Sequence, residues 1–202
     1  MNKKMLIVLY GKQNQGKTSC LKELAKLLSG SYDDSSFNSK LSQAMKRSKG
    51  QPKDARFIIF YKGYYIFIAT GGDDWRICRV NSEFFERKIG GNVNIWLIKE
   101  GNIKKLEKEE KDFYINITPK VCITSCRPNG DGYGAVKAIN SYVEKTMEKV
   151  MSKSINDIEQ SYERILWLRK FEGMNRVNSA TIISNAKKKA QEIKDIIDDY
   201  LR

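Results

Sequence analysis

The chain has 202 residues, 41% of them hydrophobic, and its 37 basic and 24 acidic side chains give a net charge of +13. This length and composition favour one folded domain with a substantial core. No apolar run approaches the ~20 residues that span a bilayer, and the sequence contains no histidine. A cytoplasmic enzyme is therefore the default expectation, and any catalysis must use carboxylates, lysine, arginine or a bound metal.

The N-terminal part of the chain predicts a strand, a loop and a helix in that order. Met5 to Tyr10 is a short apolar run typical of a buried strand, and Cys20 to Leu28 carries leucine and alanine at helical spacing. The segment between them, Gly11-Lys12-Gln13-Asn14-Gln15-Gly16-Lys17-Thr18, fits the pattern G-x-x-x-x-G-K-[ST]. In such a loop the backbone N–H groups wrap a phosphate, and the helix N-terminus adds a favourable partial charge.

This motif assigns roles to its residues. Lys17 would reach the β- and γ-phosphates of a nucleotide, and the Thr18 hydroxyl would bind Mg²⁺. A chance match in an ordinary strand-turn-helix is the alternative. The predicted nucleotide-binding residues are Gly11, Lys12, Gln13, Asn14, Gln15, Gly16, Lys17, Thr18 and Ser19.

A polar and basic segment follows, from Ser29 to Lys53, with a short helix expected over Leu41 to Lys46. Residues 1–62 hold thirteen basic and four acidic side chains, a net charge of +9. This excess favours a polyanionic partner such as nucleotide phosphates or nucleic acid, and a surface that only confers solubility is the alternative. The densest positive charge comes from Lys40, Lys46, Arg47, Lys49, Lys53 and Arg56.

Two apolar runs, Arg56 to Tyr61 and Tyr64 to Thr70, are joined by Lys62-Gly63 and predict a β-hairpin. The second run leads into Gly71-Gly72-Asp73-Asp74. A helix is predicted from Trp75 to Lys88, and another strand from Val93 to Ile98.

The charged stretch from Glu100 to Asp112 is expected to be a loop or short helix, with a hairpin through Glu100-Gly101-Asn102 as the alternative. Phe113 to Ile117 is expected to be an edge strand. Lys120 to Ser125 predicts a strand that leaves through a glycine-rich loop containing Arg127.

From Ala135 onward the apolar spacing predicts helices: one to Met151, a second from Ser154 to about Phe171, and a third beginning at Ser179. The chain is therefore divided into a nucleotide-binding domain, residues 1–151, and a C-terminal helical extension, residues 152–202. The apolar faces of these helices must be buried. They are expected to pack on the sheet domain, and a homodimer interface is the alternative.

Four cysteines are present: Cys20, Cys78, Cys122 and Cys126. Only the last two are close in sequence, and the chain offers no histidine to complete a zinc site. Buried free thiols are therefore expected.

By its glycine loop the chain resembles the P-loop NTPase superfamily. The resemblance implies a three-layer α/β sandwich with a mostly parallel sheet. The hairpin adds one antiparallel strand, and the C-terminal helices complete the predicted fold. The resemblance also implies that the chain binds Mg²⁺ and a nucleoside triphosphate at the carboxyl ends of the strands.

The coarse order also looks like that of Ras-like GTPases, whose second core strand ends in Asp-x-x-Gly. Aligned on that motif, Ala69 stands where the Mg²⁺-linked aspartate should be, and Asp73 occupies the water-positioning place. No Asn/Thr-Lys-x-Asp guanine-reading motif is present, so ATP is expected rather than GTP.

Three further residues are assigned to the site. Asp73 and Asp74, with Thr18, form the predicted metal set, although the two acids would alternatively cap the following helix. Arg127, at the exit of its strand, would pair with a phosphate or a second substrate, or be an ordinary surface arginine. Lys17, Asp73 and Arg127 form the predicted catalytic set.

The leading function is Mg²⁺-dependent binding and hydrolysis of ATP. A small-molecule or nucleotide kinase is the second hypothesis, with Asp33 and Asp34 as added candidates for acceptor-binding acids. The third is a module whose nucleotide state regulates binding to nucleic acid or protein.

Overall fold

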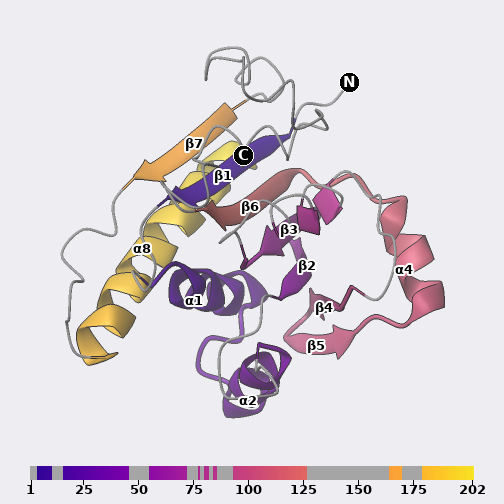
Figure 1. Cartoon of the computed structure of the whole chain (residues 1–202), viewed down its shortest axis with the longest axis horizontal. Coiled ribbons are helices and arrows are strands. Elements are labelled where there is room, and N and C mark those ends of the chain that lie inside the picture. Colours follow the sequence, from indigo (N-terminus) through magenta and orange to yellow (C-terminus); the bar gives the residue numbers. More distant parts are fainter. Residues whose placement is uncertain are drawn as a thin grey trace.

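A seven-stranded sheet forms the centre of the part of the chain that the computed structural model describes (Figure 1). The described residues are 4–10, 16–45, 55–71, 77, 80–81, 84–85, 93–126, 164–169 and 179–202. The strands are β1 (Met5–Tyr10), β2 (Arg56–Tyr61), β3 (Tyr64–Ala69), β4 (Ile95–Lys99), β5 (Asn102–Lys105), β6 (Val121–Cys126) and β7 (Arg164–Arg169).

The strand order is β5-β4-β2-β3-β6-β1-β7, with four of the six neighbouring pairs parallel. β1 lies between β6 and β7, parallel to both, and β6 separates β1 from β3. The α/β class and the mostly parallel sheet are thus confirmed. The expectation of a single antiparallel hairpin is wrong, because β2 with β3 and β4 with β5 form two antiparallel pairs.

Helices cover both faces of this sheet. The side chains of Met5, Ile7 and Leu9 point to the face that holds α1 (Lys17–Ser29), α2 (Ser35–Ala44) and α8 (Ser179–Tyr200). Leu6 and Val8 point to the other face, with Phe84, Phe85 and α4 (Lys108–Ile115). β1 is consequently buried on both sides, which explains why its sequence is a continuous apolar run rather than an alternating one.

Both hairpins turn through the same backbone geometry. The loop residues Lys62 and Gly63 have φ of 49° and 82°, and Glu100 and Gly101 have φ of 50° and 72°. Two successive positive φ values are the mark of a type I′ turn, whose twist matches that of the flanking strands. The alternative hairpin through Glu100-Gly101-Asn102 is thus confirmed.

Two predicted elements are wrong. The edge strand expected over Phe113–Ile117 does not form, since residues 113–115 belong to α4, whose first turn holds the acidic Glu109 and Glu110. Acidic side chains there stabilise a helix start. The helix expected to end near Phe171 is replaced over Arg164–Arg169 by β7, so the C-terminal extension is not purely helical. A short apolar run does not distinguish helix from strand by its period.

The helix α8 is docked on the sheet domain through small and branched side chains. Figure 1 shows α8 beside α1. Ala186, Ala190, Ile193 and Ile197 are fully buried in the cluster that also holds the apolar side chains of α1. Alanines at this contact let two helix backbones approach closely. The face predicted to need a partner is therefore covered within the chain at these positions. Ile183, on the same helix, is 49% exposed.

The end of α8 is tied to the β2–β3 turn by Asp198. Its Oδ1 accepts a hydrogen bond from the Tyr61 hydroxyl at 2.7 Å and lies 2.8 Å from Lys62 Nζ. Lys194 Nζ donates to Oδ2 at 2.6 Å. Although burial opposes the charged carboxylate, these hydrogen bonds outweigh it and hold the pKa of Asp198 well below its usual range.

We expect Asp198→Asn to lower the free energy of unfolding by about 2 kcal/mol at pH 7, because charged hydrogen bonds are lost. A depressed pKa in the folded state stabilises the protein above the ordinary carboxyl pKa of about 4, and this contribution is lost as the pH falls below that value. Urea unfolding of both proteins at pH 7 and pH 3 should show the difference shrinking in acid. Asp199→Asn is the matched control, because its side chain is 65% exposed. An equal effect of the two substitutions would contradict the assignment.

Candidate functional site

The candidate site lies at the carboxyl edge of the parallel strands. The last residue of β1, Tyr10, is paired in register with Cys126 of β6 and Arg169 of β7. Six positions later, Gly16 is the N-cap of α1. The glycine loop thus connects the carboxyl end of a central strand to the N-terminus of a helix, the context that the motif requires. Residues 11–15, which form the rest of the loop, lie outside the described residues.

Gly16 has φ 81° and ψ 10°, the left-handed conformation that glycine adopts without a steric penalty. Its carbonyl oxygen accepts the Cys20 N–H at 2.8 Å, so α1 begins here. Among the described residues, no side chain caps this helix end, and its first turn holds no acidic residue. Within the described part of the chain, the N-terminal N–H groups therefore carry partial positive charge without a capping side chain or a first-turn acid to neutralise it.

Three predicted binding residues, Lys17, Thr18 and Ser19, form the first turn of α1. Lys17 is only 7% exposed, while Thr18 and Ser19 are half-buried. Side chains of this length at a helix start can reach a ligand that occupies the loop. The structure therefore gathers a lysine and two hydroxyl groups at one uncapped helix end.

A buried polar cluster, which sequence reasoning missed, lies at the same edge of the sheet. Ser125 Oγ donates to the carbonyl oxygen of Thr70 at 3.2 Å, and Thr124 Oγ1 donates to that of Gly71 at 3.3 Å. Asn81 Nδ2 donates to the same Gly71 oxygen at 2.7 Å. The cluster is buried, with each of its side chains at most 3% exposed: Thr70, Asn81, Thr124 and Ser125. The cluster fixes the exit of β3 against β6, the neighbour of β1.

Thr70 also joins this exit to the start of β2. Its Oγ1 accepts the Ala55 N–H at 2.8 Å, and its own N–H donates to the Ala55 oxygen at 3.0 Å. The backbone at Thr70 and Gly71 is therefore fixed by hydrogen bonds to Ala55, before β2, to Thr124 of β6 and to Asn81. The polar Asn81 between the apolar Ile77, Val80 and Phe84 was the sequence signal that could have identified the cluster.

The remaining predicted site residues lie outside the described residues. These are the loop residues Gly11 to Gln15, the acids Asp73 and Asp74, and Arg127. In sequence, Asp73 follows Gly71 by two positions, and Arg127 directly follows the last residue of β6. In the described part of the chain, no group of three cysteine, aspartate or glutamate side chains could hold a metal ion.

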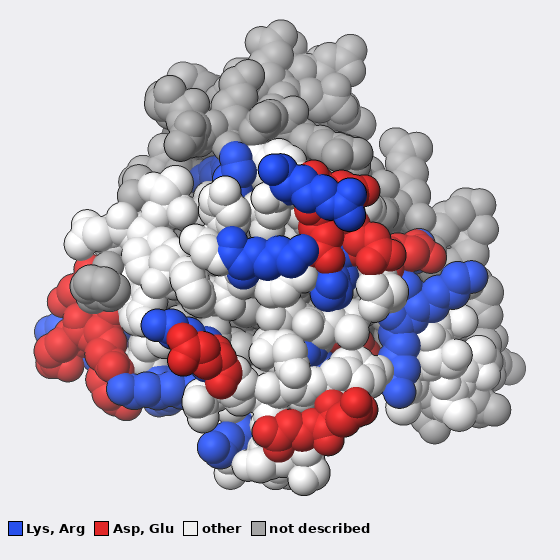
Figure 2. Space-filling view, turned by 180° about the vertical axis from the view of Figure 1, so that it is seen from behind, with Lys and Arg blue, Asp and Glu red and all other residues white. Residues whose placement is uncertain are grey.

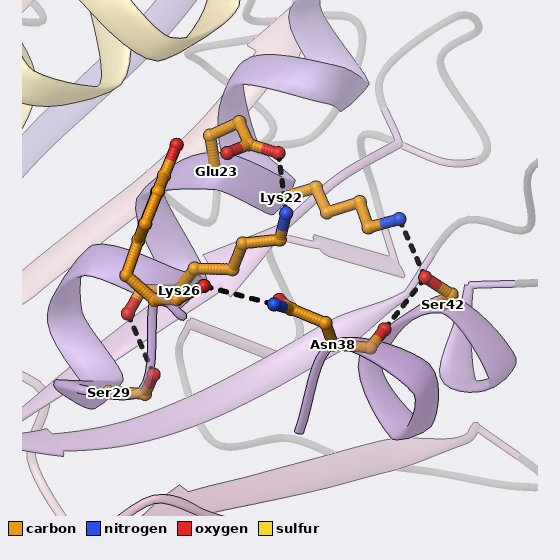
Figure 3. Close-up of polar contacts among 7 residues, drawn as sticks. Lys22, Glu23, Lys26, Ser29, Asn38 and Ser42 are labelled. Atoms are coloured by element: carbon orange, nitrogen blue, oxygen red, sulfur yellow. Dashed lines mark hydrogen bonds and ion pairs between the residues drawn. The ribbon is translucent and has the colours of Figure 1, made fainter. Parts of the chain in front are cut away.

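Asp34, a candidate for binding a kinase acceptor, has a structural role. Its Oδ1 accepts the N–H groups of Ser36 and Phe37 at 2.8 and 3.1 Å and so caps α2. Polar contacts also join α2 to α1, where Lys22 Nζ donates to Ser42 Oγ at 2.8 Å (Figure 3).

Two of the four cysteines can be compared with their predicted state. Cys20 and Cys122 are buried free thiols, as expected. Burial raises the pKa of the Cys20 thiol, which keeps it protonated and unreactive. β6 runs through Cys122 and Cys126.

The charge of the surface was expected to be unevenly basic. On the face seen in Figure 2, basic and acidic side chains of the described residues are interspersed. Of the six residues predicted to form the densest positive charge, Lys40 and Arg56 are described, the first exposed and the second half-buried. Among the described residues, no helix is both long and apolar enough to span a membrane.

Comparison of the chain with protein-family models, with curated proteins and with solved structures gave no match. The functional assignment therefore rests on the geometry of the site and on its sequence motif.

Proposed function

We propose that this chain binds Mg²⁺ and a nucleoside triphosphate, with ATP preferred over GTP, and hydrolyses the nucleotide. The observation that carries the proposal is Gly16, which adopts a left-handed conformation at the start of α1, six positions after the end of the buried parallel strand β1 and without a capping side chain among the described residues. This start belongs to a complete G-x-x-x-x-G-K-[ST] segment. An anion is the natural ligand of such a helix end.

The chemistry of the reaction would be positioning and charge neutralisation. The N–H groups at the start of α1 and the Lys17 ammonium would bind the phosphates, and the Thr18 hydroxyl would hold Mg²⁺. The metal would bridge two phosphate oxygens and spread the charge that develops during transfer.

In the sequence, two acids and an arginine follow the ends of the neighbouring strands β3 and β6. Asp73 and Asp74 follow the anchored Gly71, and one of them would hold the metal or orient the attacking water. One strand separates β3 from β1, which corresponds to about 10 Å between their axes, a span that a triphosphate with a hydrated metal can bridge. Arg127, after β6, would face the same ligand.

We expect calorimetric titration of the wild type with Mg²⁺-ATP to give a dissociation constant in the micromolar range and weaker binding of GTP. Thr18→Ala should weaken Mg²⁺-ATP binding about tenfold, because a metal ligand is lost, and leave ATP binding in EDTA unchanged. Ser29→Ala, which removes a hydroxyl from the opposite end of α1, is the matched control. Folded wild-type protein that binds no nucleotide at about 1 mM would overturn the proposal.

A further inference from the structure

Lys22 of α1 is a half-buried lysine whose ammonium meets a neutral partner. Its Nζ donates to the hydroxyl oxygen of Ser42 on α2 at 2.8 Å (Figure 3). That hydroxyl in turn donates to the Asn38 carbonyl oxygen at 2.8 Å, so the groups that α2 offers to this ammonium carry no charge. An ammonium that loses part of its hydration without gaining a negative partner is less stable than one in water.

The neighbouring charges on α1 also disfavour the ammonium of Lys22. The adjacent carboxylate belongs to Glu23, and its Oε1 forms an ion pair with Lys26 Nζ at 2.8 Å (Figure 3). Lys26 lies one helical turn from Lys22 and carries the same charge, which is unfavourable. Burial and then the Lys26 ammonium lower the pKa of Lys22 below its ordinary value, and the opposing effect of Glu23 is smaller. At neutral pH, a larger fraction of Lys22 than of an ordinary surface lysine is therefore an unprotonated amine.

This environment activates a lysine as a nucleophile. Desolvation and a neighbouring cation are the two means by which enzymes prepare lysines for attack on carbonyl carbons. Lys22 has both, and because it is only half-buried its amine stays within reach of a small reagent. Lys22 and Lys26 together carry more positive charge than Glu23 neutralises, which favours an anionic reagent. An acyl phosphate fits these requirements, since it combines an anionic phosphate with an electrophilic carbonyl carbon.

We propose that Lys22 is a site of covalent modification, acylated by acyl phosphates. The unprotonated Nζ attacks the acyl carbon, an amide C–N bond forms, and the bond between that carbon and the phosphate oxygen breaks. The phosphate leaves with the electron pair, and the nitrogen releases one proton to water. The product has lost its positive charge but keeps one N–H that can donate to Ser42, so the contact between α1 and α2 persists. The modification does not depend on nucleotide hydrolysis.

The test compares Lys22 with Lys104 in the same folded protein. Lys104 has a side chain that is 62% exposed, but its Nζ lies 2.5 Å from Glu110 Oε1, and this hydrogen bond raises the pKa of Lys104. We expect acetyl phosphate at about pH 8 to acetylate Lys22 at least about fivefold faster than Lys104. Quantitative mass spectrometry of peptides from the early part of the reaction measures both rates. A rate at Lys22 that does not exceed the rate at Lys104 would overturn the proposal.

Two variants test whether the surroundings of Lys22 set this rate. Ser42→Asp puts a carboxylate where the ammonium now meets a hydroxyl, and Lys26→Gln removes the like charge and leaves the Glu23 carboxylate without its ion pair. Each should slow acetylation of Lys22 at least about fivefold, because both changes stabilise the ammonium. Ser42→Ala is the matched control: it removes only a neutral acceptor, so the rate should not fall. Lys104 provides the reference rate in every variant. An unchanged rate at Lys22 in the folded Ser42→Asp and Lys26→Gln proteins would contradict the proposed activation.

Discussion

Replacement of Lys17 by alanine is expected to lower the rate of ATP hydrolysis at least about 100-fold, the loss typical of one preorganised charge in a phosphoryl-transfer site. Lys17 is 7% exposed in the first turn of α1, immediately after the left-handed Gly16. A ligand in the loop would meet its ammonium in a site of low water content, where electrostatic stabilisation is strong. Phosphate release at saturating Mg²⁺-ATP measures the effect.

Lys22→Ala is the matched control for this substitution. Lys22 lies on the same helix, and its ammonium donates to Ser42 of α2 (Figure 3). The substitution removes the same charge and a comparable length of side chain. We expect its rate to lie within about twofold of the wild type, because no ligand contact is lost. Equal rates in the two folded variants would contradict the role assigned to Lys17.

The second large effect concerns the docking of α8. Ile193→Ala should lower the free energy of unfolding by about 3 kcal/mol, because a fully buried side chain is removed from the core that α8 shares with α1. Urea denaturation measures the change. Ile183→Ala makes the same substitution on the same helix where the side chain is 49% exposed, and should change stability by less than about 0.5 kcal/mol.

Denaturation at several protein concentrations distinguishes docking within one chain from docking between two. We expect the midpoint of unfolding to be independent of concentration, since Ile193 is buried within a single chain. A midpoint that rises with concentration, or equal effects at Ile183 and Ile193, would show that α8 buries its apolar face elsewhere.

The elements predicted best from the sequence are those with two agreeing signals. β1 and α1 flank a glycine loop, and the β2–β3 hairpin combines two apolar runs with a Lys62-Gly63 turn. The two wrong predictions rest on a single sequence signal or on signals that conflict. Residues 113–115 are apolar and aromatic enough for a strand, yet the acidic residues before them start a helix. Residues 164–169 become an edge strand because β1 offers an unpaired side. That pairing is a tertiary contact that no local pattern contains.

The candidate site, like the fold, could be predicted only in part. The motif identified Lys17, Thr18 and Ser19, which the structure brings together at one helix end. The cluster of Asn81 and Thr124 around Gly71 was not predicted, because its members come from distant parts of the chain and meet only when β6 is placed between β1 and β3. Asn81 and Thr124 are common residue types, and only their position in the fold shows that they contact Gly71.

The most direct test of nucleotide binding at α1 is a crystal structure of the chain with Mg²⁺ and a non-hydrolysable ATP analogue. We predict that the β- and γ-phosphates accept hydrogen bonds from the N–H groups at the start of α1 and from Lys17 Nζ. We also predict that the metal binds Thr18 Oγ1 and an oxygen of Asp73 or Asp74, directly or through water. A nucleotide bound away from Gly16, or an α1 N-terminus without phosphate at saturating analogue, would contradict the proposal.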